Sequence, residues 1–122
     1  MILVDTSVWI DHLRGADRGL EHALLTGLIL THPFVIGEIA LGQLRERTRL
    51  LENLHELPMA VVAADDEVLR LIDRANLFGR GIGYVDAHLL AAARLSGNAA
   101  LWTRDRLLRD AAQHLGLAYA GR

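Results

Sequence analysis

Short apolar runs alternate with longer helical patterns along the whole chain, and this alternation constrains the fold more than any other feature of the sequence. Residues 2–5 form a tight apolar run that predicts a buried strand, and Thr6 and Ser7 follow it as candidates for a helix N-cap. Further strands are predicted at 28–31, 59–63, 99–103 and 117–120, and helices at 6–13, 17–25, 33–44, 50–55, 65–77, 84–95 and 105–115. Strands that alternate with helices favour a parallel sheet covered on both faces. We therefore expect one α/β domain over residues 1–122.

Two residue types are missing from the composition, and their absence excludes several classes of enzyme. All 13 Lys and Arg residues are arginine, so the chain has no lysine for a P-loop or a pyridoxal Schiff base. It also has no cysteine, which excludes disulfides, thiolate zinc sites and cysteine nucleophiles. The N-terminus lacks a basic stretch ahead of an apolar one, and no apolar run approaches the roughly 20 residues of a membrane span. We expect a cytoplasmic protein without a membrane partner.

Two acids stand where predicted strands give way to helices. Asp5 ends the first apolar run, and Asp105 follows the run at 99–103. Ligands of open α/β sheets bind at the carboxyl ends of the strands, so two acids at this edge can come close in space. Each acid is equally well explained as a helix N-cap, a position that aspartate favours. Taken singly, neither residue distinguishes a ligand site from a cap.

Two further acids lie on helices that are otherwise strongly apolar. Glu38 stands in PFVIGEIALG, where a charged group has few routes to water, and Asp86 stands in GYVDAHLLAAARL. Carboxylates are rarely buried unless they are paired or bind a cation. The structural alternatives are a solvent-facing Glu38 and an Asp86 that is stabilised by the helix dipole.

The combination of the four acids favours one shared site. Two lie at strand ends and two on apolar helices, so each comes from a separate element. Carboxylates that converge repel one another unless a cation neutralises them, and hard oxygen ligands suit Mg²⁺ or Mn²⁺ rather than zinc. Such a site polarises a phosphodiester and activates water, with one metal ion or two. The pattern predicts metal-dependent phosphodiester hydrolysis, although spacing alone does not establish the convergence.

Other polar features carry less weight. His88 follows Asp86 by two residues, about 200° around a helix, so the two side chains do not readily face one ion. Gly79, Gly81 and Gly83 follow a predicted helix rather than a strand, which favours a flexible connection over a dinucleotide-binding loop. Arginines suit phosphate binding, but a solvated helix face explains the same residues. The candidates for phosphate contact are Arg45, Arg47, Arg49, Arg104, Arg106 and Arg109.

Four segments form a recognisable pattern in this order: MILVDTSVWID, GEIALG, GYVDAHLLAAA and LWTRDRLL. Together they span almost the whole chain, and they resemble the PIN-domain family and, more narrowly, the VapC toxins of bacterial VapBC toxin–antitoxin pairs. The resemblance implies a PIN-like, Rossmann-like α/β fold of three layers, in which helices flank a central, mostly parallel sheet. It also implies a Mg²⁺- or Mn²⁺-dependent endoribonuclease, an RNA substrate, a cognate VapB antitoxin and a homodimer.

The resemblance also assigns roles to individual residues. The family's acidic positions match Asp5, Glu38, Asp86 and Asp105, and its supporting hydroxyl positions match Thr6, Ser7 and Thr103. Asp5, Asp86 and Asp105 are the implied metal ligands, and Glu38 would help to orient the attacking water. Many family members carry a further acid two residues after the position of Asp105, where this chain has Leu107. The departure leaves the number of metal ions open.

Two other functions fit parts of the pattern. An aspartate-nucleophile phosphatase also places an aspartate after a strand, but it needs an acid where this chain has Ser7 and a lysine that the chain lacks. A catalytically silent metal- or nucleic-acid-binding PIN module would have lost one or more of the acids, and all four are present. The favoured function is an RNA-cleaving toxin, which a segment of the antitoxin would inhibit by entering the acidic groove.

Overall fold

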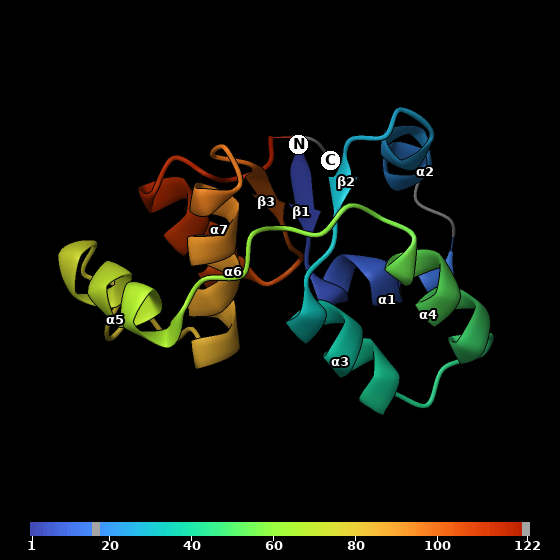
Figure 1. The fold of residues 1–122 in the computed structure, drawn as a ribbon, viewed down its shortest axis with the longest axis horizontal. Coiled ribbons are helices and arrows are strands. Elements are labelled where there is room, and N and C mark those ends of the chain that lie inside the picture. The colour runs from blue at the N-terminus through green and yellow to red at the C-terminus, as the bar shows by residue number, and fades with distance from the viewer. Residues whose placement is uncertain (16–17, 121–122) are drawn as a thin grey trace.

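Three short strands and seven helices make up the fold that the computed structural model describes over residues 1–15 and 18–120 (Figure 1). The strands are β1 (Ile2–Val4), β2 (Ile29–Leu30) and β3 (Ala100–Trp102). The helices are α1 (Thr6–Arg14), α2 (Arg18–Leu25), α3 (Pro33–Leu41), α4 (Arg47–His55), α5 (Asp65–Arg74), α6 (Tyr84–Leu95) and α7 (Arg106–His114). The predicted helix start at Asp17 lies outside the described residues.

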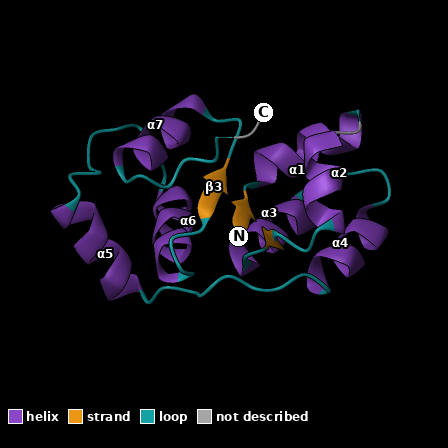
Figure 2. Cartoon of the chain, turned by 90° about the horizontal axis from the view of Figure 1, so that it is seen from above, coloured by secondary structure: helices purple, strands orange, loops and turns teal. Residues whose placement is uncertain are grey.

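The strands form one parallel sheet in the order β2-β1-β3, with Leu3 of the central strand opposite Leu30 on one side and Leu101 on the other. All three leucines are buried, as expected for strands covered on both faces. Figures 1 and 2 agree that α1–α4 lie on one side of the sheet and α5–α7 on the other. The predicted three-layer α/β fold with a parallel sheet is therefore confirmed.

Two predicted strands were wrong, because each pairs with the sheet at a single position. Residues 59–63 make one bridge, between Met59 and Thr31. The N–H of Val61 then donates to Ser96 Oγ instead of to the carbonyl of a neighbouring strand. Residues 117–120 make one bridge, between Ala118 and Leu101. Both segments have strand-like sequences, but their backbones leave the sheet after one residue.

Helix boundaries differ from the predictions mainly around α3 and α4. The helix that begins at Pro33 ends at Leu41 rather than near Leu44, because Gly42 takes an extended conformation. Arg47 then opens α4, and its Nε donates to the carbonyl of Ala40 at 2.9 Å. This contact satisfies one of the carbonyl groups that the end of α3 leaves without a helical partner.

The core is centred on α6, whose residues from Ala87 to Ala93 are all buried. This helix packs against β1 and β3 on one side and against α5 on the other. Small alanine side chains bring α6 close to the sheet, so the N-terminal turn of α6 ends near the carboxyl ends of the strands. Within the described residues, no helix is long and apolar enough to cross a bilayer.

Candidate active site

Asp5 lies at the carboxyl end of the central strand, where its backbone N–H donates to the carbonyl of Trp102 at 2.9 Å. Its side chain is buried and forms no capping hydrogen bond with α1. Instead, Asp5 Oδ2 accepts from the hydroxyls of Ser7 at 2.7 Å and Thr103 at 2.8 Å. The cap interpretation therefore does not describe this carboxylate, which two hydroxyls hold at the strand end.

Backbone donors orient these two hydroxyls. The N–H of Arg104 donates to Ser7 Oγ at 3.0 Å, and the N–H of Asp105 donates to Thr103 Oγ1 at 3.0 Å. Because each hydroxyl oxygen accepts from a backbone N–H, its own proton is free to point to Asp5. The chain segment at 103–105 thus fixes the carboxylate through an ordered set of hydrogen bonds.

Glu38 lies on the exposed face of α3, so the expectation that it lacks routes to water was wrong. The helix turns Val35 and Ile39 into the core, while the apolar Leu41 is 91% exposed. The apolar neighbours that suggested burial are thus partly surface residues themselves. Glu38 Oε1 accepts from Thr6 Oγ1 at 2.7 Å, which ties its side chain to the first turn of α1, next to Asp5.

Asp86 lies in the first turn of α6, where the charges of the other three acids act on it. Its Oδ2 accepts from the N–H of Gly83, the N-cap residue, at 3.1 Å. This position at the helix N-terminus is the one on which the alternative of stabilisation by the helix dipole relied. Burial raises the pKa of Asp86, and the charges of Asp5, Asp105 and Glu38 raise it further, while the Gly83 hydrogen bond acts in the opposite direction. The charges of Asp5, Glu38 and Asp105 all act on Asp86, so each of these three acids lies within electrostatic reach of it.

Asp105 is both a helix cap and a member of this group. Its Oδ1 accepts from the N–H groups of Leu107 at 2.9 Å and Leu108 at 3.2 Å, which is a regular N-cap of α7. The residue is exposed, and its charge contributes to the raised pKa of Asp86. The cap interpretation is therefore correct for Oδ1 of Asp105, and it does not exclude a metal-binding role for the same residue.

Leu107, at the position where many relatives carry another acid, packs against the loop between α5 and α6. Gly81 has φ of 79°, and a Cβ at this position would lie 2.9 Å from Leu107 Cδ1. Glycine is therefore favoured at residue 81 both by its backbone conformation and by the close approach of the leucine. An apolar contact occupies the place of a further carboxylate.

The donor chemistry of this edge suits a hard divalent cation. Carboxylate oxygens supply the charge. Burial is the main cause of the raised pKa of Asp86, and repulsion by the other acids, which a cation would relieve, adds to it. Among the described residues, no three Asp, Glu or His side chains stand close enough together to form a ready-made metal site. Mg²⁺ is commonly held by one or two carboxylates together with water and substrate phosphate, so a compact set of three is not required.

The two buried histidines lie in an aromatic row beside the acids rather than among them. His88 Nε2 lies 3.2 Å from Asp65 Oδ1, and its ring packs edge-on against Phe34 and Tyr84. Burial, with a contribution from His88, lowers the pKa of His32 to about 4, and its Nδ1 accepts from the N–H of Phe34 at 3.0 Å. The expectation that His88 and Asp86 face different ways agrees with these contacts.

Sequence reasoning missed two hollows that flank α1. One is a cavity of about 650 Å³ between α1, α2 and α4, into which Trp9 is set. The other is a hollow of about 530 Å³ that begins at Ser7 and reaches Arg14. The spacing of Ser7, Asp11 and Arg14 at i, i+4 and i+7 on one helix was the signal that could have revealed the second.

Comparison with known proteins adds a family match. Residues 2–113 match the model of the PIN domain. Two curated relatives are both Ribonuclease VapC32 of Mycobacterium tuberculosis, from strains CDC 1551 / Oshkosh and ATCC 25618 / H37Rv. Each is 50% identical over 120 residues, which cover 98% of this chain and 97% of the relative.

The fold also resembles a solved structure, the crystal structure of PAE2754 from Pyrobaculum aerophilum. The TM-score is 0.60 and the sequence identity 24%, and the match covers 90% of this chain and 78% of that chain. At this identity the likeness bears on the fold alone.

Proposed function

This chain belongs to the PIN-domain family and is a VapC-type member of it, and on that premise we propose that it is a divalent-metal-dependent endoribonuclease. Residues 1–122 would form one PIN domain and act as the toxin of a type II toxin–antitoxin pair in the cytoplasm. The observation that carries the proposal is the arrangement at one sheet edge, where Thr103 links Asp5 to Asp105 and Thr6 ties Glu38 to the first turn after Asp5. Four like charges from four elements at one sheet edge are costly unless a cation offsets them.

Asp5, Asp86 and Asp105 would hold the cation, Mg²⁺ or Mn²⁺. When bound, the ion would polarise the scissile phosphodiester and lower the pKa of the attacking water. The acids that hold it keep one oxygen each for structural hydrogen bonds, as Asp105 does with the first turn of α7. The second oxygen of each carboxylate would face the ion.

The chain's own residues would orient and deprotonate the attacking water. Glu38 is exposed enough to reach a water molecule and is held by Thr6, so it would accept the water's proton at Oε2 while Oε1 keeps the Thr6 hydrogen bond. Ser7 and Thr103 would keep the Asp5 carboxylate in a fixed position, because both hydroxyls donate to it. The role of Ser7 and Thr103 is to position Asp5.

A cognate VapB-type antitoxin would bind beside the site and place a segment against the carboxylates. The cavity between α1, α2 and α4 suits the body of such a partner, since Trp9 is 3% exposed and its Nε1 finds no acceptor among the described residues. An unpaired buried N–H costs about 1–3 kcal/mol, which a partner carbonyl would recover. α1 lines this cavity with Trp9 and also supplies Ser7, one of the two hydroxyls that hold Asp5.

A homodimer would form through the exposed face of α3 and its surroundings. Leu41 is 91% exposed, Phe34 37% and Tyr84 47%, and Phe34 and Tyr84 pack on the same ring of His88. Exposed apolar side chains that gather in this way mark interaction surfaces. A two-fold symmetric pair is the commonest arrangement for such a surface.

The deciding experiment incubates the purified protein with total bacterial RNA in Mg²⁺, in Mn²⁺ and in EDTA, and sequences the new RNA ends. Asp5→Asn serves as the test variant, and Asp110→Asn, on the exposed side of α7, as the matched control. We expect metal-dependent cuts at a few sites in the wild type and in Asp110→Asn, and none in Asp5→Asn.

Two results would contradict the proposal. An identical cleavage pattern in wild type and Asp5→Asn would assign the activity to a contaminant. Absence of cleavage under every metal, with Mn²⁺ still bound, would instead make the chain a silent metal-binding module.

A further inference from the structure

One face of α1 leads directly away from the candidate active site. Ser7, Ile10, Asp11 and Arg14 stand at i, i+3, i+4 and i+7, so they share a side of the helix. Ser7 at its beginning donates to Asp5, and Arg14 lies in its last turn. This face starts at the carboxylates and ends in a positive charge.

Two neighbouring hollows follow this face. The first, of about 530 Å³, is lined by Ser7, Ile10, Asp11, Arg14 and Arg104. The second, of about 310 Å³, is lined by Ile10 and Arg14 again and by Gln43, Arg45 and Glu46 of the segment after α3. Because they share Ile10 and Arg14, they are neighbours along the helix, and we call the pair of hollows the α1 groove.

The ion pairs around the α1 groove leave it positive. Arg104 Nε lies 3.2 Å from Asp11 Oδ2, and Glu46 lies 3.9 Å from Arg49. Both acids of the groove are therefore already paired. Arg14 and Arg45 are exposed and form no ion pair within the described residues, although the formal net charge of the chain is −2.

We propose that the α1 groove binds the sugar–phosphate backbone of RNA beside the cleaved bond, with Arg14 and Arg45 contacting phosphates. Arg104 would leave its ion pair with Asp11 and bind the phosphate nearest to Ser7 instead. This inference rests on the proposed function and names the residues that hold its substrate. The eight residues from Ser7 to Arg14 rise about 10 Å over seven helical steps, long enough to follow more than one phosphate of a strand.

The chemistry of the groove favours a phosphate strand over an acidic peptide. The groove begins at Ser7, next to Asp5, so its ligand must carry negative charge from the scissile bond onwards. A polynucleotide meets this requirement, because it carries one negative charge at every nucleotide. Guanidinium groups bind phosphates in a bidentate way without reading base identity. The α1 groove would thus fix the path of the strand and leave the choice of sequence to other contacts.

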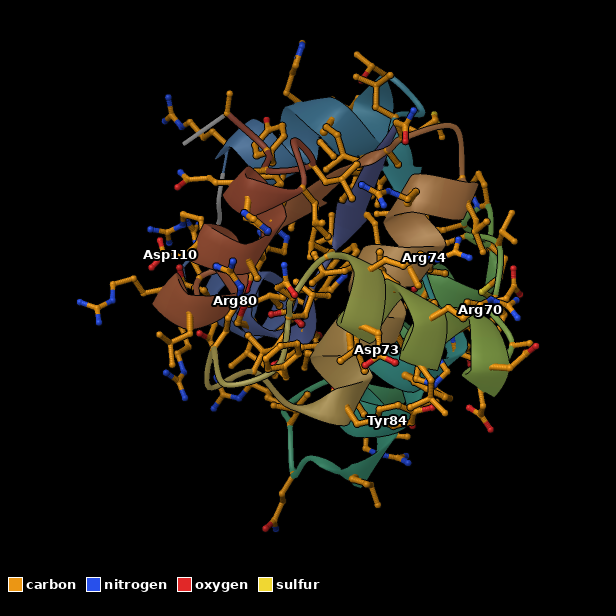
Figure 3. The ribbon with its side chains drawn as sticks, turned by 90° about the vertical axis from the view of Figure 1, so that its left-hand side faces the viewer. Arg70, Asp73, Arg74, Arg80, Tyr84 and Asp110 are labelled. Carbon is orange, nitrogen blue, oxygen red and sulfur yellow. The ribbon has the colours of Figure 1, made fainter. Side chains whose placement is uncertain are left out.

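The test measures binding separately from cleavage. Asp86→Asn prevents turnover, and a fluorescently labelled RNA that contains one mapped cleavage site is titrated at several salt concentrations. If no site maps, a mixed-sequence RNA replaces it, since phosphate contacts do not depend on sequence. In this background Arg14→Gln and Arg45→Gln are compared with Arg74→Gln, a control on α5 whose place is labelled in Figure 3.

We expect each α1-groove variant to weaken binding severalfold and to reduce the slope of log K against log salt by about 0.7, the value for one lost contact to a single strand. Arg74→Gln should change neither quantity. Replacing single phosphates by neutral methylphosphonates should weaken wild-type binding at two or three neighbouring positions. At the position that Arg14 contacts, the same replacement should have little further effect in Arg14→Gln.

Several results would overturn the inference. One is equal binding and equal salt slopes for Arg14→Gln, Arg45→Gln and Arg74→Gln. Another is a loss of antitoxin affinity in the groove variants with RNA binding intact, which would assign the groove to the protein partner. Failure of the proposed function is distinct from both, since it would appear as absence of metal-dependent cleavage by the wild type.

Discussion

Thr103 and Asp5 lie 98 positions apart in the chain, and the hydroxyl of Thr103 donates to Asp5 Oδ2 at 2.8 Å. The same oxygen of Thr103 accepts from the N–H of Asp105. One buried side chain therefore connects the first acid of the candidate site to the last, and it does so at the junction of β1 and β3.

Thr103→Val should weaken both the fold and the site. The substitution removes the donor to Asp5 and leaves the N–H of Asp105 without its acceptor, and a hydrogen bond to a charged group contributes about 1.5–3 kcal/mol. We expect a loss of this order in the free energy of unfolding, measured by urea titration, together with reduced RNA cleavage. Thr103→Ser keeps the hydroxyl and should retain most of both, so equal losses in the two variants would contradict the assigned role.

The pKa of Asp86 should lie above the usual range of an aspartate, chiefly because the residue is partly buried and further because of the charges of its neighbours. Since the charges of Asp5, Asp105 and Glu38 raise its pKa, Asp105→Asn should lower it while asparagine still caps α7. Carboxyl ¹³C NMR titration measures this directly without reference to activity. Asp110→Asn provides the comparison, and an Asp86 pKa that is unchanged in Asp105→Asn would show that the two acids do not interact.

Metal binding should appear as a change in thermal stability with a defined sign. An acid whose folded pKa is raised stabilises the fold at low pH, and this contribution is lost as pH rises through the folded pKa. At neutral pH without metal, Asp86→Asn should therefore raise Tm. Mg²⁺ at one hundred times its Kd should stabilise the wild type by about 2.7 kcal/mol and so raise its Tm. The Tm of Asp86→Asn should rise much less. Equal Mg²⁺ shifts would place the ion elsewhere.

His32 should make the protein less stable in mild acid. Its folded pKa of about 4 lies below the unfolded value of 6.5, so the unfolded chain binds the proton more tightly and stability falls as pH falls through this window. We expect a loss of about 2 to 3 kcal/mol between neutral pH and about pH 4.5, measured by urea unfolding. His32→Asn keeps an acceptor for the N–H of Phe34 and should show a shallower slope over the same window.

Trp9 should contribute to antitoxin affinity through its indole N–H. Trp9→Phe removes the donor and should weaken the complex roughly 3- to 10-fold, the equivalent of one net hydrogen bond. Isothermal titration calorimetry measures the change. Trp102→Phe makes the same chemical change at a buried position outside the cavity. Equal effects of the two substitutions would attribute the loss to general destabilisation.

The positions of the strongly periodic elements could be predicted from the sequence, and the ends of weak ones could not. The helix at 84–95 has the predicted bounds because its apolar face and its cap at Gly83 act together. The strands predicted at 59–63 and 117–120 failed since β-type composition does not reveal whether a partner strand continues. Each segment finds its partner at one residue only.

The candidate site, too, could be predicted from the sequence only in part. That Asp5 and Asp105 meet at one sheet edge followed from strand direction, which the alternation of elements fixes. The exposure of Glu38 did not follow, because the composition of α3 does not say which of its apolar residues face the core. The roles assigned to the acids in catalysis and metal binding stay predictions that the experiments above test.

The strand order has a consequence for synthesis. β1 is made first yet lies in the middle of the sheet, and it gains β3 only when residues 100–102 exist. At roughly 5–20 residues per second, a ribosome adds Thr103 some 5 to 20 seconds after Asp5. During that interval the growing polypeptide carries its first carboxylate with Ser7 but without Thr103, the second of the two hydroxyls that hold it. The surroundings of Asp5 are therefore completed only when β3 pairs with β1, after most of the chain has been made.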